Sequence, residues 1–319
     1  LWGTGDAECR ELAERAAEIA RTTNDPLREG RALRFLGWHD AVGGHSFRGR
    51  KTLEASLARF QQTGQLDESA ACLADLSLVL SWVDEPSAAL DAAEKAVALS
   101  RETGDRRQEA IILRRLAAVR NHQREFVAAL TAVQAALNLH REIGDRDEEC
   151  HGLSVLGITL GSLGKHDEAA GAFQQMLELA EETGSARGID WGVSNMVHFV
   201  FCPRGEHEAG LAFLETRLAR ARQAKQQYVA AQIQLLRVRL LLTLGQQELA
   251  LEVARSVLPD ADRFLHYADQ QWLLQLVGRC QAELGRFHQA QESFQGGLER
   301  TEKCSEPVWA AIFRLDMAD

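Results

Sequence analysis

A 40-residue internal period constrains this chain more than any other feature of its sequence. Asn24, Gly64, Gly104, Gly144 and Gly184 stand at the same phase of the period. Repetition at a period of about 20 to 50 residues indicates a solenoid, in which each unit buries its apolar face against its neighbours. Two columns of apolar residues keep the same spacing: Leu33, Leu73, Leu113, Leu153, Val193, Ile233 and Leu273, and Leu36, Leu76, Leu116, Leu156, Met196, Leu236 and Leu276.

Each unit divides into two helices, and the second helix carries a signature of its own. A small residue is followed by apolar residues four and eight positions later, which places all three on one helix face. The small residue marks the point where the two helices of a hairpin approach most closely. The seven sets, which predict seven hairpins, are Gly49/Leu53/Leu57, Ala89/Ala93/Val97, Ala129/Val133/Leu137, Ala169/Phe173/Leu177, Gly210/Leu214/Leu218, Ala250/Ala254/Leu258 and Ala290/Phe294/Leu298.

The five prolines test this division, because a proline inside a helix costs about 3 kcal/mol. All of them fall at predicted boundaries: Pro26, Pro86, Pro203, Pro259 and Pro307. The glycines at the turn stand where a helix end favours a left-handed residue, and an aspartate that follows such a glycine can cap the next helix. We expect this capping role for Asp105 and Asp145.

One irregularity interrupts the period in the fifth repeat. Leu156 is followed thirteen residues later by Ala169, whereas Met196 is followed fourteen residues later by Gly210. We therefore expect the hairpin turn to gain one residue from this repeat on. Because the first-helix columns stay in register, we also expect the following inter-repeat loop to be one residue shorter.

The predicted fold is all-α, a solenoid of antiparallel helix hairpins that forms one repeat domain over residues 1–319. Residues 6–23 match the second helix of an earlier hairpin and 304–319 the first helix of a later one. Both ends therefore look like half-repeats, as expected of a segment of a longer polypeptide. The seven full repeats are predicted at 24–63, 64–103, 104–143, 144–183, 184–223, 224–263 and 264–303.

Composition and charge narrow the possible partners. The net charge of −10 argues against direct nucleic-acid binding, which needs several Lys or Arg set against phosphates. No apolar run approaches the ~20 residues that span a bilayer, so we expect no membrane contact. Six cysteines without a C-x-x-C spacing predict free thiols in a reducing cytoplasm and no metal site. Packing is the expected role of Cys72 and Cys280.

Enzyme motifs are missing from the sequence. There is no G-x-S-x-G, no G-x-x-x-x-G-K-[ST], no H-E-x-x-H and no pair of histidines four residues apart among the ten. The glycine-rich stretch 43–46 lies in a predicted hairpin turn without a preceding strand. We therefore predict that the chain is not an enzyme, with no catalytic residue and no cofactor.

The columns resemble the tetratricopeptide repeat, whose pattern places Leu-Gly in the first helix and Ala followed by an aromatic residue in the second. This pattern is seen at Leu36-Gly37, Leu156-Gly157, Ala169/Phe173 and Ala290/Phe294. The unit has 40 residues rather than the usual 34, which predicts longer helices. The motif R-E-x-G-D-R-x-x-E at 141–149 resembles motifs in the sensor arrays of bacterial STAND-type signalling ATPases and transcription activators. It is also similar to motifs in the long repeats of spindle adaptor proteins. The resemblance implies a right-handed superhelix whose first helices line a concave groove.

The family pattern also indicates which first-helix positions face the groove. Those positions are five, two and one residues before, and two residues after, the core leucine. The candidate groove-binding residues are Trp191, Asn195, His198, His151, Arg114, Arg115, Trp38, Arg34, Asp75, Gln234, Gln271 and Gln275.

Two clusters stand out among these candidates. Trp191, Asn195 and His198 lie on one face of the fifth repeat and combine an aromatic ring, an amide and an imidazole, as recognition surfaces do. The competing interpretation is that Trp191 and His198 fill space between long helices. Arg114 and Arg115 could bind a carboxylate, or they could be solvated surface charges.

The sequence favours a binding module over catalysis. Our leading hypothesis is the sensor array of a larger bacterial regulator, which binds a protein, a peptide or a small effector in its groove. The alternative hypothesis is a constitutive adaptor, or a scaffold that associates with itself through an exposed half-hairpin.

Overall fold

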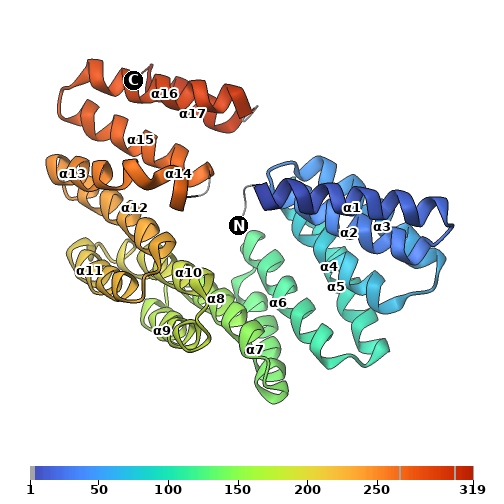
Figure 1. The fold of residues 1–319 in the computed structure, drawn as a ribbon. Helices are drawn as coiled ribbons and strands as arrows, with labels where there is room; N and C mark the ends of the chain where they lie inside the picture. Colours follow the sequence, from blue (N-terminus) through green and yellow to red (C-terminus); the bar gives the residue numbers. More distant parts are fainter. Residues whose placement is uncertain (1–3, 266, 305–306, 319) are drawn as a thin grey trace. The chain divides into compact units, whose positions relative to one another are not determined.

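The structure is a computed structural model that describes residues 4–265, 267–304 and 307–318. Side chains are described for 8–265, 268–301 and 310–318, so those of Cys304 and Trp309 lie outside the described residues. No β-strand occurs in the described ranges, and the all-α prediction is confirmed (Figure 1). The helices are α1 (Thr4–Thr22), α2 (Pro26–Val42), α3 (Ser46–Gln62), α4 (Leu66–Trp82), α5 (Pro86–Thr103), α6 (Arg106–His122), α7 (Phe126–Ile143), α8 (Arg146–Ser162), α9 (His166–Thr183), α10 (Ala186–Met196), α11 (His207–Gln223), α12 (Gln227–Thr243), α13 (Gln247–Val257), α14 (Ala261–Phe264), α15 (Tyr267–Glu283), α16 (Phe287–Cys304) and α17 (Pro307–Asp316).

Seven pairs of consecutive helices follow the predicted hairpin order, from α2/α3 to α15/α16, with α1 before them and α17 after them. Two short elements interrupt the pattern: a π-helical turn at Val197–Phe201 and a 3-10 turn at Leu258–Asp260 that contains Pro259. The chain divides into two compact units, unit 1 (Leu1–Ala172) and unit 2 (Phe173–Asp319). A single repeat domain over all 319 residues stays a prediction.

The turns explain why the period is so regular in unit 1. Gly104 and Gly144 have φ of 74° and 77°, the left-handed conformation that glycine adopts without strain. Asp105 then accepts a hydrogen bond from the Gln108 backbone nitrogen at 3.0 Å, which confirms its predicted role as a helix cap. Asp145 caps α8 in the same way.

An ion pair across each of these turns explains the repeated sequence R-E-x-G-D-R-x-x-E. Arg101, near the end of α5, pairs with Glu109 in α6 at 2.7 Å. Arg141, near the end of α7, pairs with Glu149 in α8 at the same distance. The spacing of eight residues therefore joins the second helix of one repeat to the first helix of the next.

The small residues of the second helices let the hairpins close. A Cβ atom added to Gly49 in α3 would lie 2.5 Å from the backbone oxygen of Gly37 in α2. The same position is Ala89 in α5 and Ala129 in α7, both fully buried. Because the helices approach to backbone contact here, a larger side chain would separate them.

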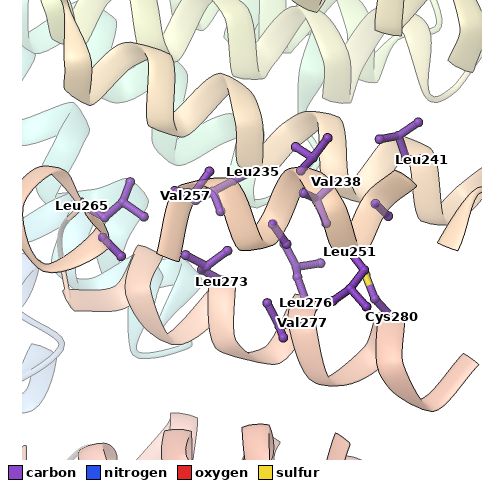
Figure 2. Packing of buried hydrophobic residues seen from close by; sticks show 14 residues of the cluster. Leu235, Val238, Leu241, Leu251, Val257, Leu265, Leu273, Leu276, Val277 and Cys280 are labelled. Atoms are coloured by element: carbon purple, nitrogen blue, oxygen red, sulfur yellow. The ribbon is translucent and has the colours of Figure 1, made fainter. Parts of the chain in front are cut away.

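One core cluster of unit 2 is built mainly from α12, α13 and α15, which belong to the sixth and seventh repeats. Figure 2 shows Leu235 and Val238 of α12 packed with Leu251 of α13 and with Leu273 and Leu276 of α15. Cys280 of α15 belongs to the same cluster and is fully buried, in agreement with its predicted packing role. Burial raises the pKa of the Cys280 thiol to about 11, so at neutral pH it is a thiol rather than a thiolate.

The fifth repeat corrects the sequence prediction about its extra residue. The left-handed residue of the hairpin turn moves from Gly164 to Gly205, a step of 41, and the inter-repeat turn moves from Gly184 to Lys225, also 41. The helix widens into a π turn at Val197–Phe201, where the Cys202 nitrogen bonds the Val197 oxygen at 2.9 Å. One π turn takes up one additional residue. The insertion thus lies in the first helix, and the following loop is not shortened.

Candidate functional site

Ten of the twelve candidate residues, all except Gln234 and Gln271, stand at equivalent positions of the first helices, and we call this set of positions the first-helix face. It consists of the residues five, eight, nine and twelve positions after the first residue of each first helix. In α2 these are Arg31, Arg34, Phe35 and Trp38, and in α10 they are Trp191, Ser194, Asn195 and His198. After the inserted residue the same positions are Gln232, Leu235, Leu236 and Arg239 in α12 and Trp272, Gln275, Leu276 and Arg279 in α15.

In unit 1 the face is organised around the buried carboxylate of Asp75, which is 3% exposed. Arg34 of α2 donates to Asp75 at 2.5 Å, and Arg115 of α6 donates to its other oxygen. One carboxylate of α4 therefore joins three successive first helices. Two charge-assisted hydrogen bonds compensate the cost of burying this group.

An aromatic pair extends the Asp75 cluster. The guanidinium carbon of Arg115 lies 5.6 Å from the ring centre of Trp38, within the range of a cation–π contact. The Trp38 and Trp82 rings are 5.7 Å apart. The structure thus brings together four of the predicted residues, Trp38, Arg34, Asp75 and Arg115, and adds Trp82, which the sequence analysis did not select.

Arg114 and His151 meet at a second carboxylate in unit 1. Arg114 of α6 donates to Glu148 of α8 at 3.0 Å, and His151 lies 3.7 Å from the same side chain. Burial by itself would raise the pKa of Glu148, but His151 and Arg114 outweigh that effect and lower it to about 2. Both arginines of the proposed carboxylate clamp are therefore paired with acidic residues of the chain itself.

The histidine of the fifth repeat has a defined tautomer. His198 lies in the π turn, and its Nδ1 is 2.8 Å from the backbone oxygen of Ser194, which can only accept. Nδ1 therefore carries the hydrogen, and Nε2 accepts from Arg239 of α12. Desolvation of the ring lowers the pKa of His198, and the charge of Arg239 lowers it further. A neutral, oriented imidazole beside a guanidinium results.

Trp191 and Asn195 lie on the same helix as His198. The Trp191 side chain is 43% exposed, which is unusual for so large an apolar group, and Asn195 is half-buried. Gly192 lies between them, and a Cβ atom there would be 2.6 Å from Leu177 Cδ2 of α9. Close packing of α10 on α9 thus explains one of the two glycines in this helix.

The three predicted glutamines have different environments. Gln234 is 8% exposed and accepts from Arg237 at 2.6 Å. Gln271 is fully buried, so its side chain is not available at the surface, and neither of its amide atoms has a partner in the described residues. Gln275 belongs to the first-helix face and donates to Asp316 of α17 at 2.9 Å.

A polar network that the sequence analysis missed connects α10, α12 and α15. Tyr228 donates to Asp190 at 3.2 Å, and Gln232 donates to Asp269 at 2.5 Å and to the Tyr228 hydroxyl at 3.3 Å. Burial raises the pKa of Asp190 to about 6 against the opposing hydrogen bond from Tyr228, and nearby Asp269 adds to the rise. Two carboxylates thus lie in one network, and none of the described side chains forms an ion pair with Asp190.

The inserted residue explains why Gln232 and Arg239 were missed. If the apolar columns are continued at a constant spacing of 40 residues through the fifth repeat, Gln234 of α12 and Gln271 of α15 are predicted to stand at face positions. A step of 41 after Met196 points instead to Gln232, Arg239 and Trp272. The fourteen-residue spacing from Met196 to Gly210 does reveal the inserted residue, but the sequence prediction places that residue in the hairpin turn instead of in the helix.

Two further findings concern chemistry and membranes. Within the described side chains, no group of three or more His, Cys, Asp or Glu is arranged to hold a metal ion. None of the helices in the described ranges combines the length and apolar character needed to cross a bilayer.

Comparisons with known proteins agree with this fold. Residues 108–182 match the tetratricopeptide repeat family. No curated protein matches the chain as a whole or in part at a significant level. The match covers nearly all of the third and fourth repeats and includes the R-E-x-G-D-R-x-x-E sequence at 141–149, where the two repeats join.

Three solved structures illustrate the similarity. Aspartyl phosphate phosphatase F from Bacillus subtilis is 13% identical, with a TM-score of 0.57 over 92% of this chain and 75% of that chain. A STAND protein with a tetratricopeptide repeat sensor from Pyrococcus horikoshii is 13% identical, with a TM-score of 0.58 over 97% of this chain and half of that chain. A Rap protein complexed with Competence and Sporulation Factor is 15% identical, with a TM-score of 0.50 over 99% of this chain and 97% of that chain. At these identities the similarity establishes the fold: the chain is an array of tetratricopeptide-like repeats.

Proposed function

We propose that this array is a non-catalytic recognition module, the sensor of a larger bacterial regulator, and that it binds a protein or peptide at the first-helix face of unit 2. The observation that carries the proposal is the exposed Trp191 two helical turns before His198, whose ring is fixed by Ser194 and Arg239. An aromatic ring with polar groups at fixed positions is typical of residues that dominate binding energy.

The polar network strengthens this proposal. Asp190 is held in a site that disfavours its ionised form, so it costs stability at neutral pH. Groups that reduce stability are frequent at functional sites. The π turn supports the same location, because an inserted residue that widens a helix is frequent at functional sites.

The similar structures suggest the kind of partner. One is a protein complexed with a factor, and another contains a tetratricopeptide repeat sensor. We therefore expect a peptide or protein segment as the partner. A small effector would be the alternative ligand of the same face.

A peptide-library screen followed by two substitutions tests the proposal. Peptides that bind the wild-type chain are titrated into Trp191→Ala and His198→Ala, with Phe287→Ala as the control because Phe287 is a 72% exposed aromatic residue of α16. We expect each site variant to weaken binding by at least about tenfold and the control to leave it unchanged. Equal affinities for all three variants would remove the proposed site.

A second candidate function is self-association through α1. This helix exposes Leu12 and Ile19 at 57% and 60%, and a pocket of about 730 Å³ between α1 and α2 is lined by Ala16 and Ala20. Exposed apolar side chains beside an apolar pocket favour a protein contact. Light scattering of the chain and of Ile19→Asp tests this function, because a strictly monomeric wild type would exclude it.

A further inference from the structure

Arg217 of α11 is a buried charge at a position where the other repeats have small or apolar residues. It lies ten residues after the first residue of its helix and is 7% exposed. The equivalent residues in five other second helices are Ser56, Ala96, Ala136, Met176 and Val257. Because an unpaired buried guanidinium is costly, its presence in one repeat alone requires a local explanation.

The described side chains compensate Arg217 only in part. Arg217 and Arg220 both donate to Glu181 of α9, and Glu181 forms the only ion pair that either guanidinium has in the described residues. The second guanidinium nitrogen of Arg217 bonds the Gln174 oxygen at 3.4 Å, and the group lies 5.3 Å from the ring centre of Phe213. Two positive charges thus share one carboxylate.

Burial lowers the pKa of Arg217, and Glu181 opposes this effect while Arg220 adds to it. The exposed Glu178 acts on Arg217 in the same direction as Glu181, but from outside hydrogen-bonding distance. Each guanidinium has five N–H donors, and most of them remain available here. A further anion beside Arg217 would therefore be favourable.

Next to the two guanidinium groups the structure has an open space of suitable size. A pocket of about 340 Å³ is lined by Arg217, Arg220 and Glu181, with Ile189 of α10 and Gln226 at the start of α12. This volume is sufficient for a small ligand or for the charged end of a larger one.

The start of α12 adds a second attractive element to the pocket. The first backbone N–H groups of a helix lack partners within the helix and attract anions. In α6 and α8 a carboxylate of the chain, Asp105 or Asp145, occupies that place. Gln226 stands there in α12 and its side chain does not cap the helix. The side chain of Gln65 likewise leaves the start of α4 uncapped, so an uncapped helix start is not special by itself. At α12 it gains significance because the pocket and Arg217 lie next to it.

We infer that the pocket between α9, α11 and the start of α12 binds an oxyanion, the carboxylate or phosphate group of a ligand, with Arg217 as the principal donor. Arg220 donates from the exposed side, and the first turn of α12 supplies backbone N–H groups. The bound anion takes the place that the aspartate cap has in α6 and α8. This site is separate in its residues from Trp191 and His198, so each can fail without the other.

Titration of the chain with inorganic phosphate and, separately, with acetate tests the inference. Binding is followed by calorimetry and by amide chemical shifts, and the two anions distinguish a phosphate from a carboxylate ligand. Arg217→Met removes the principal donor. It should fold, because Met176 occupies the equivalent position fully buried. Arg220→Gln changes a 59% exposed side chain and provides a second variant that cannot disturb the core.

We expect at least one of the two anions to bind saturably to the wild type. Arg217→Met should weaken that binding by at least about tenfold, since a charge-assisted hydrogen bond is lost, and Arg220→Gln should weaken it less. Arg222→Met, on the same helix but outside the pocket lining, is the matched control and should leave binding unchanged. Glu181→Gln should strengthen binding because it removes the competing carboxylate.

Three results would overturn the inference, two of them from the binding constants and one from the chemical shifts. One is saturable binding with the same constant in the wild type and in Arg217→Met. The other is the lack of saturable binding of either anion to both the wild type and Glu181→Gln. Shifts at Trp191 and His198 without shifts at Gln226 would also contradict it, since they would place the anion at the first-helix face.

Discussion

The first-helix faces of the two units use similar residues for different purposes. In unit 1 the arginines are paired with acidic residues of neighbouring first helices, as in Arg34–Asp75–Arg115 and Arg114–Glu148. In unit 2 Trp191 is exposed, and the neutral ring of His198 accepts from the cationic guanidinium of Arg239. Asp190, which precedes Trp191 in α10, forms no ion pair with the described side chains. We infer from this contrast that the paired charges of unit 1 stabilise the stack, whereas Asp190 reduces the stability of unit 2, in which we expect binding.

Removal of the central carboxylate of unit 1 should have the largest effect. Asp75→Ala leaves Arg115 without an ion pair among the described residues and leaves Arg34 with Glu68 alone, at 3.7 Å, so we expect the free energy of unfolding to fall by about 3 kcal/mol. Urea denaturation followed by circular dichroism measures this change. The control Asp91→Ala removes an exposed ion pair with Lys95 and should change stability by less than about 0.5 kcal/mol. Equal effects of the two variants would contradict a structural role for the unit 1 face.

Asp190→Asn in unit 2 should raise the free energy of unfolding, whereas Asp75→Ala in unit 1 should lower it. The pKa of Asp190 in the fold is about 6, above its ordinary value of 3.8, so the fold gains relative stability below pH 3.8 and loses it as the pH rises through 6. A gap of roughly two pKa units corresponds to about 2 to 3 kcal/mol. We expect the variant to be more stable than the wild type by this amount at pH 7 and by much less at pH 4. A destabilised variant at pH 7 would show that the carboxylate holds unit 2 together.

His140 tests whether every polar group in unit 1 is stabilising. It is fully buried, neither ring nitrogen has a partner in the described residues, and Phe60 fills the equivalent place in α3. Burial lowers the pKa of His140, so its contribution to stability is complete above its ordinary value of 6.5 and is lost as the pH falls below it. His140→Phe should raise stability by about 1 kcal/mol at pH 7 and more at pH 5. Thermal unfolding at both pH values measures the difference, and a variant with an unchanged pH dependence would contradict this role.

We expect substitution of Trp191 to have the smallest effect on stability in this series, although we expect it to have a large effect on binding. Trp191→Ala removes a side chain that is 43% exposed, and we expect a loss of no more than about 1 kcal/mol. Urea denaturation of the variant, compared with Asp75→Ala, places the two faces on one scale. A loss comparable to that of Asp75→Ala would support the alternative interpretation, in which Trp191 fills space between helices.

Most of the fold could be predicted from the sequence because similar residues recur at equivalent positions of the repeats. A left-handed turn residue, usually glycine, and a small residue at the helix contact recur at a nearly fixed spacing, and an aspartate caps α2, α6 and α8. The helices therefore follow largely from the pattern. The π turn could not be placed in this way. Its extra residue shows only as a change of spacing, and the sequence alone does not decide whether a helix or a turn takes it up.

The candidate site was predicted less completely. Arg34, Asp75 and Arg115 do meet, because a spacing of 40 or 41 residues puts them on successive first helices. Trp38 of α2 also reaches Arg115 of α6, two repeats later. The pairing of each charge depends on side-chain geometry between repeats, which a periodic pattern does not specify. Arg239 and Gln232 were missed for a simpler reason, since a one-residue slip moves every later position on the helix by about 100°.

We propose that unit 2 presents the binding face and that unit 1 is the scaffold. Amide hydrogen exchange of the full chain, with and without a peptide selected from a library, tests it most directly. We predict new protection in α10, the π turn at Val197–Phe201 and α12, with α2, α4 and α6 unchanged. New protection confined to α2, α4 and α6 would contradict the account.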